Sequence, residues 1–184
     1  MGRFGRVAVG LAGLAMLAAC GPHPVVKTGA DPVATTPAGG AKASTAPVAH
    51  VGDTISLAGN DDGEKVAVKL VKIVDPAKGR EFSTPDKGNR FVAVQFKLTN
   101  VGKTAYDDSP SNGAAVVDTD GQRFDATIDD VTAGPSMSSD VKMAAGDSAL
   151  GYLVFEVPKA SKLRSVQFTL DSGFADQTGE WRLP

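Results

Sequence analysis

The sequence is poor in cysteine and histidine, the residues that most often build disulfides and nucleophilic catalytic sites. Cysteine occurs once, at Cys20, so no disulfide can form within the chain. The two histidines, His23 and His50, both lie in the first third of the sequence. Residues 51–184 therefore contain no histidine, which excludes a Ser-His or Cys-His catalytic pair built within that part of the chain.

Long hydrophobic runs and a strong excess of positive charge are also missing. The apolar stretch Val7–Leu17 holds about eleven residues, whereas a membrane-spanning helix needs about twenty. The basic residues Arg3 and Arg6 precede it and small residues follow it, which is the order typical of a secretory signal. We expect residues 1–19 to be a signal peptide that is removed on export.

The single cysteine directly follows this segment. The motif Leu17-Ala18-Ala19-Cys20 resembles the lipobox of bacterial lipoproteins, in which the thiol receives a diacylglycerol and the chain is cut before it. Lipidation accounts for an unpaired thiol in an exported protein, and each buried CH₂ group contributes about 0.8 kcal/mol to membrane attachment. We expect Cys20 to anchor the protein at the extracytoplasmic face of the cell membrane. The alternative is a signal cut a few residues away, with Cys20 incidental.

The composition changes after the cysteine, and it divides the rest of the chain into two parts. Residues 20–50 are rich in Gly, Ala, Ser and Thr and contain five prolines, which predicts a disordered tether. Residues 51–184 have the length of one domain. They carry twenty acidic and fifteen basic side chains, a balance that argues against binding to nucleic acid.

From residue 51 onward the apolar residues follow the period of β-strands. They alternate in Val92-Val94-Phe96-Leu98 and in Val166-Phe168-Leu170, which predicts strands with one buried face. The alternation of Val66-Val68-Leu70 changes phase near Val71, where we expect a β-bulge. The pair Asp120-Gly121 predicts a hairpin. Further strands are expected at 54–57, 114–118, 122–128 and 150–157, and around Trp181 and Leu183.

These segments, with no helical pattern of ten or more residues between them, predict an all-β fold. Seven to nine short strands favour a two-sheet antiparallel β-sandwich. We expect Phe168 and Trp181 to pack in its core, because large aromatic residues at the last strands are usually buried. Met137 and Met143 are expected to fill gaps in the core rather than to bind copper.

One stretch of the sequence resembles a known family. Residues 87–102, with a glycine before a long strand and an Asn-x-Gly turn after it, are similar to the central signature of the DUF4352 family. The resemblance implies an immunoglobulin-like β-sandwich in an exported or lipid-anchored protein, chiefly of Gram-positive bacteria, and it carries no catalytic residues. The residues themselves suggest that Asn100 and Gly102 end the strand, because both tolerate positive φ.

The candidate for chemistry in this domain is a group of seven aspartates between residues 107 and 130. If the strands around Asp120-Gly121 pair, Asp118, Asp120 and Asp125 would supply oxygen ligands to calcium. The spacing does not match an EF-hand, and the simpler alternative is a solvated acidic face. The motifs Gly146-Asp147-Ser148 and Gly102-Lys103-Thr104 are interpreted as turns rather than as an esterase or phosphate-binding motif.

Two functional hypotheses from different classes follow. The first is a lipid-anchored, non-catalytic, immunoglobulin-like domain of unknown ligand. It would use a sheet face or its loops to contact another envelope component, an extracellular or host protein, or a small ligand. We expect no cofactor, and we expect the membrane to be contacted through the lipid on Cys20. The second is a carboxylate- or calcium-dependent hydrolase that uses the acidic residues 107–130, which requires at least two carboxylates with perturbed pKa values to converge in a cleft.

Overall fold

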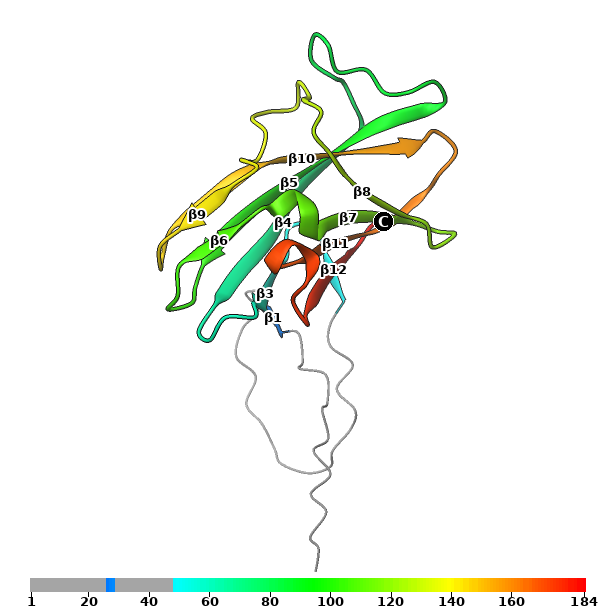
Figure 1. Cartoon of the computed structure of the whole chain (residues 1–184). Coiled ribbons are helices and arrows are strands. Elements are labelled where there is room, and N and C mark those ends of the chain that lie inside the picture. The colour runs from blue at the N-terminus through cyan, green and yellow to red at the C-terminus, as the bar shows by residue number, and fades with distance from the viewer. Residues whose placement is uncertain (1–25, 29–47) are drawn as a thin grey trace, which may run out of the picture.

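The computed structural model describes residues 26–28 and 48–184 (Figure 1). The predicted signal peptide, Cys20 and most of the predicted tether lie outside the described residues. Twelve strands and two short helical turns make up the described part. The elements are β1 (Val26–Thr28), β2 (Ala49–His50), β3 (Thr54–Ala58), β4 (Lys65–Ala77), β5 (Asn89–Asn100), β6 (Tyr106–Asp108), α1 (Pro110–Gly113), β7 (Ala114–Asp118), β8 (Arg123–Thr127), β9 (Val141–Met143), β10 (Ser148–Pro158), β11 (Leu163–Thr169), η1 (Asp171–Gly173) and β12 (Thr178–Arg182).

Ten of these strands form one continuous, folded sheet in the order β1-β3-β4-β5-β10-β8-β7-β11-β12-β2. Strand β8 pairs with β10 on one side and with β7 on the other, so the sheet turns over at β8 and forms two facing layers. All neighbouring pairs are antiparallel except β12 with β2. The predicted antiparallel β-sandwich is confirmed. The described residues form twelve strands rather than the seven to nine expected, and the additional strands β1, β2, β6 and β9 are only two or three residues long.

Strands β1 and β2 lie within residues 20–50, the range predicted to be a disordered tether. Strand β1 pairs with β3 at the edge of the sheet, with Val26 opposite Ser56. Strand β2 pairs with β12, with Ala49 opposite Trp181, and Ala49 is buried. The folded domain therefore begins at or before Ala49, and one segment of the predicted tether forms an edge strand.

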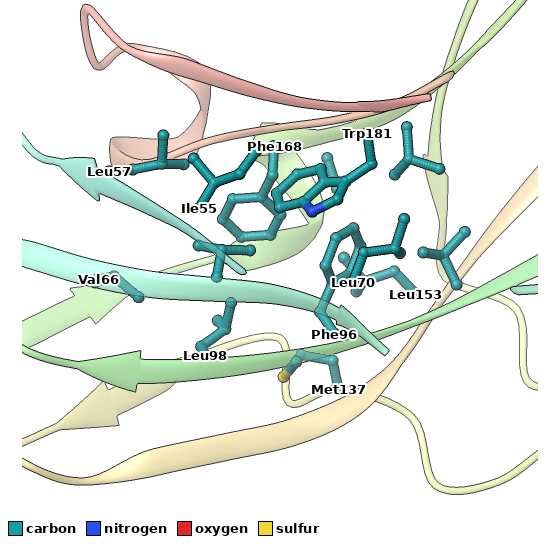
Figure 2. Close-up of a cluster of buried hydrophobic side chains, with 14 of the residues drawn as sticks. Ile55, Leu57, Val66, Leu70, Phe96, Leu98, Met137, Leu153, Phe168 and Trp181 are labelled. Atoms are coloured by element: carbon teal, nitrogen blue, oxygen red, sulfur yellow. The ribbon is translucent and has the colours of Figure 1, made fainter. Parts of the chain in front are cut away.

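Aromatic side chains from both layers meet in the core between them (Figure 2). The Phe96 ring of β5 lies 5.1 Å from the Phe168 ring of β11 and 6.1 Å from the Trp181 ring of β12, measured between centroids. All three side chains are fully buried, and the Trp181 indole N–H donates to the Asp53 carbonyl at 3.1 Å. The predicted core role of Phe168 and Trp181 is confirmed. Met137 and Met143 are also buried in this core, as expected.

A second, smaller core covers the opposite face of β5 and β10. It contains Phe91 and Ala93 from β5, Tyr152 and Val154 from β10, and Val131 from the β8–β9 connection. Because neighbouring residues of β5 point to opposite faces, both faces of this strand are buried over residues 91–94. The period of two predicted only one buried face for β5, so this second core was not expected.

The bulge predicted in β4 and the predicted end of β5 are both confirmed in position, but β5 ends for a different reason. The register of β4 against β5 shifts between Leu70 and Lys72, where the bulge was expected. Strand β5 ends at Asn100, but neither Asn100 nor Gly102 has a positive φ, so that part of the prediction was wrong. Instead, the Asn100 side chain accepts from the Gly102 N–H at 3.0 Å and donates to the carbonyls of Thr104 and Met143.

Candidate functional site

Two of the three aspartates predicted to bind calcium, Asp118 and Asp125, have separate roles in the hairpin between β7 and β8, and Asp120 lies in its turn. Asp118 is buried, and its Oδ1 accepts from the backbone N–H groups of Asp120 at 3.0 Å and of Gln122 at 2.8 Å. The side chain of Asp125 is exposed and forms an ion pair with Arg123 at 3.1 Å. The hairpin predicted at Asp120-Gly121 is confirmed, with Gly121 in the left-handed region at φ 85°.

The structure does not assemble these carboxylates into a ligand set. Asp125 is paired with Ala115, three residues away from Asp118 along β7. Among residues 48–184, no group of three or more His, Cys, Asp or Glu side chains is arranged to hold a metal ion. Calcium binding at Asp118, Asp120 and Asp125 stays a prediction. The hydrogen bonds of Asp118 within the hairpin give a simpler explanation for a carboxylate at this position.

The other aspartates of the acidic segment contact different groups. Asp107 forms an ion pair with Lys142 at 2.5 Å, Asp129 accepts from Thr127 at 2.6 Å, and Asp130 accepts from Ser136. Each carboxylate has its own local partner, and the partners belong to different elements. The segment 107–130 therefore does not form the convergent carboxylate site that the hydrolase hypothesis requires.

A different pair of carboxyl groups does come together, at the turn between β3 and β4. Glu64 is only 7% exposed, and its side chain lies over Gly59 so closely that no Cβ would fit there. Burial raises the pKa of Glu64 to about 7, and the negative charge of Asp171 adds to this effect. Asp171, in η1, also accepts from the Asn60 N–H at 2.7 Å.

Asp108 belongs to the same end of the molecule. Its carboxylate accepts from the Tyr106 hydroxyl at 3.2 Å and from the Ser172 hydroxyl at 2.7 Å. Burial, together with the charge of Asp108, raises the pKa of Tyr106. Asp171 and Ser172 both have φ of 53°, a strained conformation for residues other than glycine.

These bonds join the β3–β4 turn, β6 and η1 into one polar network. Its carboxylates are engaged with side chains and backbone of the domain, and Glu64 is almost inaccessible to a substrate. The arrangement favours a structural role over acid–base catalysis. Glu64 and Asp171 are more than one hundred residues apart and form no motif, so no signal in the sequence pointed to this pair.

The most exposed hydrophobic side chains lie on two loops at the other end of the sandwich. The β4–β5 loop and the β8–β9 loop are tied together by Arg80, whose backbone N–H donates to the Asp130 carbonyl and whose Nε donates to the Val131 carbonyl, both at 2.9 Å. The Asp130 N–H donates to the Ser83 hydroxyl at 3.0 Å. The two loops are therefore held against each other by several hydrogen bonds.

We call the surface of these two loops the distal loop surface, and define it by Arg80, Phe82, Ser83, Ile128 and Asp130. Phe82 is 97% exposed and Ile128 is fully exposed. An open hollow of about 970 Å³ is lined by residues 77–85 together with Asp130 and Thr132. Figure 1 shows the two loops at the top of the domain, at the end opposite to β1 and the β3–β4 turn.

The comparisons with known proteins agree with this fold. Residues 60–178 match the family model described as "Domain of unknown function (DUF4352)". The chain belongs to the DUF4352 family. The description of the family names no function, and no curated protein sequence matches the chain.

Solved structures similar to this DUF4352 domain share its β-sandwich. The secreted protein MPT63 from Mycobacterium tuberculosis is 15% identical with a TM-score of 0.52, over 76% of this chain and 100% of that protein. The putative lipoprotein YcdA from Bacillus subtilis is 17% identical with a TM-score of 0.51, over 66% of this chain and 38% of that one. The YjhA protein of B. subtilis is 12% identical with a TM-score of 0.51, over 74% and 100%. At these identities the likeness shows the fold alone.

Proposed function

We propose that this protein is an extracytoplasmic lipoprotein, anchored in the cell membrane through Cys20, whose domain binds another envelope or extracellular protein without catalysis. The signal-like segment and the lipobox-like motif before Cys20 support the anchor. The names of two structural neighbours, a secreted protein and a putative lipoprotein, are consistent with it. Among residues 26–28 and 48–184, no helix has the length and apolar character needed to cross a membrane.

The position of β1 supports an orientation for the anchored domain. Val26 follows Cys20 by six residues, which span at most about 20 Å even when fully extended. Strand β1 lies at the end of the sandwich opposite to the distal loop surface. A lipid on Cys20 would therefore hold the β1 end near the membrane and direct the loops away from it.

The exposure of Phe82 and Ile128 on these hydrogen-bonded loops is the observation on which the binding role rests. A single exposed apolar residue is common on a protein surface. Here Phe82 lines the hollow, and Ile128 is fully exposed on the loop that is hydrogen-bonded to the loop of Phe82, an arrangement typical of a contact surface. An aromatic anchor with an arginine nearby also has the composition of a binding hot spot. The aspartates of segment 107–130 have separate partners, which favours binding over the hydrolase alternative.

A photocrosslinking experiment in the native bacterium tests this function. The full chain would carry a photoreactive phenylalanine analogue at position 82 or, as a matched control, at Phe174, which is 83% exposed near η1 at the other end. We expect a discrete protein adduct from position 82 and none from position 174. Ile128→Ser should remove the adduct at 82. Absence of an adduct at position 82, or equal adducts at both positions, would contradict a specific role for the distal loops.

A further inference from the structure

A second, unassigned depression opens at the side of the sandwich, between the two layers. Strand β3 pairs with β4 only as far as Lys69, and β4 continues to Ala77 with no described strand on that side. An open groove of about 580 Å³ lies here, a size within the usual range for small-molecule sites. It runs between β4, the β10–β11 turn and the end of the chain after β12.

The floor of the groove is aliphatic. Its apolar lining comes from both layers and consists of Val51, Val71, Ile73, Leu163, Leu183 and Pro184. Ile73, Leu163 and Leu183 are partly buried and pack against the main core, so the floor is continuous with the interior of the sandwich. No aromatic ring and no histidine lines the groove. Such a surface fits a flexible hydrocarbon chain.

The rim of the groove carries positive charge that is not neutralised. Lys72 and Lys162 line the groove, and neither forms an ion pair within the described residues. The acidic residue of the lining, Asp75, is already bound to Arg90 through two hydrogen bonds of 2.6 and 3.0 Å. Two ammonium groups therefore remain available to an anion beside an apolar floor.

We propose that this groove binds a single-chain amphiphile with an anionic head group, such as a long-chain carboxylate. The hydrocarbon chain lies on the aliphatic floor, and the head group lies between Lys72 and Lys162. The combination of an apolar trough with a few convergent charges is the general pattern of a small-ligand site. The site is distinct from the distal loop surface and does not depend on the protein-binding role.

Isothermal titration calorimetry with dodecanoate, below its critical micelle concentration, tests the proposal. The full chain would carry Cys20→Ser, so that no attached lipid competes for the groove. We expect saturable binding of one dodecanoate per chain, and at least tenfold weaker binding of dodecyltrimethylammonium. Lack of saturable dodecanoate binding, or equal binding of the cationic amphiphile, would overturn the proposal.

Two charge-reversal variants provide the matched comparison. Lys72→Glu with Lys162→Glu should weaken dodecanoate binding at least tenfold. Lys69→Glu with Lys97→Glu changes the net charge equally at two exposed lysines outside the groove and should leave binding unchanged. An equal loss in both double variants would show non-specific attraction. Binding to phosphatidylglycerol vesicles without binding to free dodecanoate would assign these lysines to a membrane surface and would also overturn the proposal.

Discussion

Arg90 binds Asp75 through two parallel hydrogen bonds between β5 and β4, Nε to Oδ1 at 2.6 Å and Nη2 to Oδ2 at 3.0 Å. The hydrogen bond to Asp75 raises the pKa of Arg90 further above its already high value. The same guanidinium donates to the carbonyls of Pro158 and Ser161 at the β10–β11 turn. One half-buried side chain thus connects three parts of the sandwich beside the side groove.

Replacing Arg90 with lysine tests this connection. Lysine keeps the positive charge but lacks the planar fork that binds Asp75 and the two carbonyls together. We expect Arg90→Lys to lower the free energy of unfolding by about 1 to 3 kcal/mol, the range for losing hydrogen bonds to a charged group. Urea denaturation measures it, and Arg164→Lys, at an exposed position, is the control. Equal stability of the two variants would show that the hydrogen bonds of the Arg90 guanidinium contribute nothing to the free energy of unfolding.

The raised pKa of Glu64 predicts a specific pH dependence of stability. The pKa of Glu64 is about 7 in the folded domain, above its ordinary value of 4.5, so the folded state binds the proton more tightly than the unfolded chain does. The resulting stabilisation is fully present below pH 4.5 and is lost as the pH rises through 7. Glu64→Gln, which keeps the shape without the charge, should flatten the curve in this range. At pH 8 it should be more stable than the original protein by about 2 kcal/mol.

Thermal unfolding of the original protein and of Glu64→Gln between pH 4 and 8 measures this effect. Glu81→Gln, at an exposed position, serves as a control for the loss of one negative charge elsewhere on the domain. Parallel curves for Glu64→Gln and the original protein would show that the carboxyl group of Glu64 titrates as it does in the unfolded chain.

Substitutions of Phe168 and Phe174 form a matched pair that tests the packing of the core. Phe168 is fully buried against Phe96, whereas Phe174 is 83% exposed. We expect Phe168→Ala to cost about 3 to 5 kcal/mol, because it removes buried surface and leaves a cavity between the layers. Phe174→Ala should change stability by less than about 0.5 kcal/mol. Similar losses from both substitutions, measured by urea denaturation, would contradict the placement of Phe168.

Substitutions of Asp118 and Asp125 distinguish a structural role in the hairpin from calcium binding. Asp118→Ala removes the acceptor of two turn N–H groups and should cost about 1 to 2 kcal/mol in buffer containing EDTA. Asp125→Ala should cost little, because its ion pair with Arg123 is exposed. Melting temperatures with EDTA and with millimolar calcium test both roles. A calcium-dependent stabilisation that both substitutions abolish would bear out the calcium site instead.

The features of the fold that follow from local sequence patterns were predictable. The period of two in residues 92–98 and 166–170 placed two long strands, and the change of phase near Val71 placed the bulge. Asp120-Gly121 identified its hairpin because a left-handed turn favours glycine there. Each of these signals involves residues close together in the chain.

The features that depend on distant contacts were not predictable in the same way. Glu64 has a raised pKa because η1 places Asp171 beside it, and nothing near Glu64 in the sequence reports that contact. Phe91 and Ala93 are buried because the β8–β9 connection covers the outer face of β5 through Val131 and Ala133. The end of β5 was placed correctly for the wrong reason. Gly102 is needed because a Cβ there would meet the backbone of Gly63 and Lys65, not because of its φ.

Mass spectrometry of the protein isolated from its own membranes tests the lipid anchor. We expect the first residue to be Cys20, carrying a diacylglycerol on the sulfur, with no peptide from residues 1–19. An N-terminal peptide that retains these residues, or one in which the Cys20 thiol is unmodified, would contradict the lipid anchor and the orientation of the distal loops derived from it.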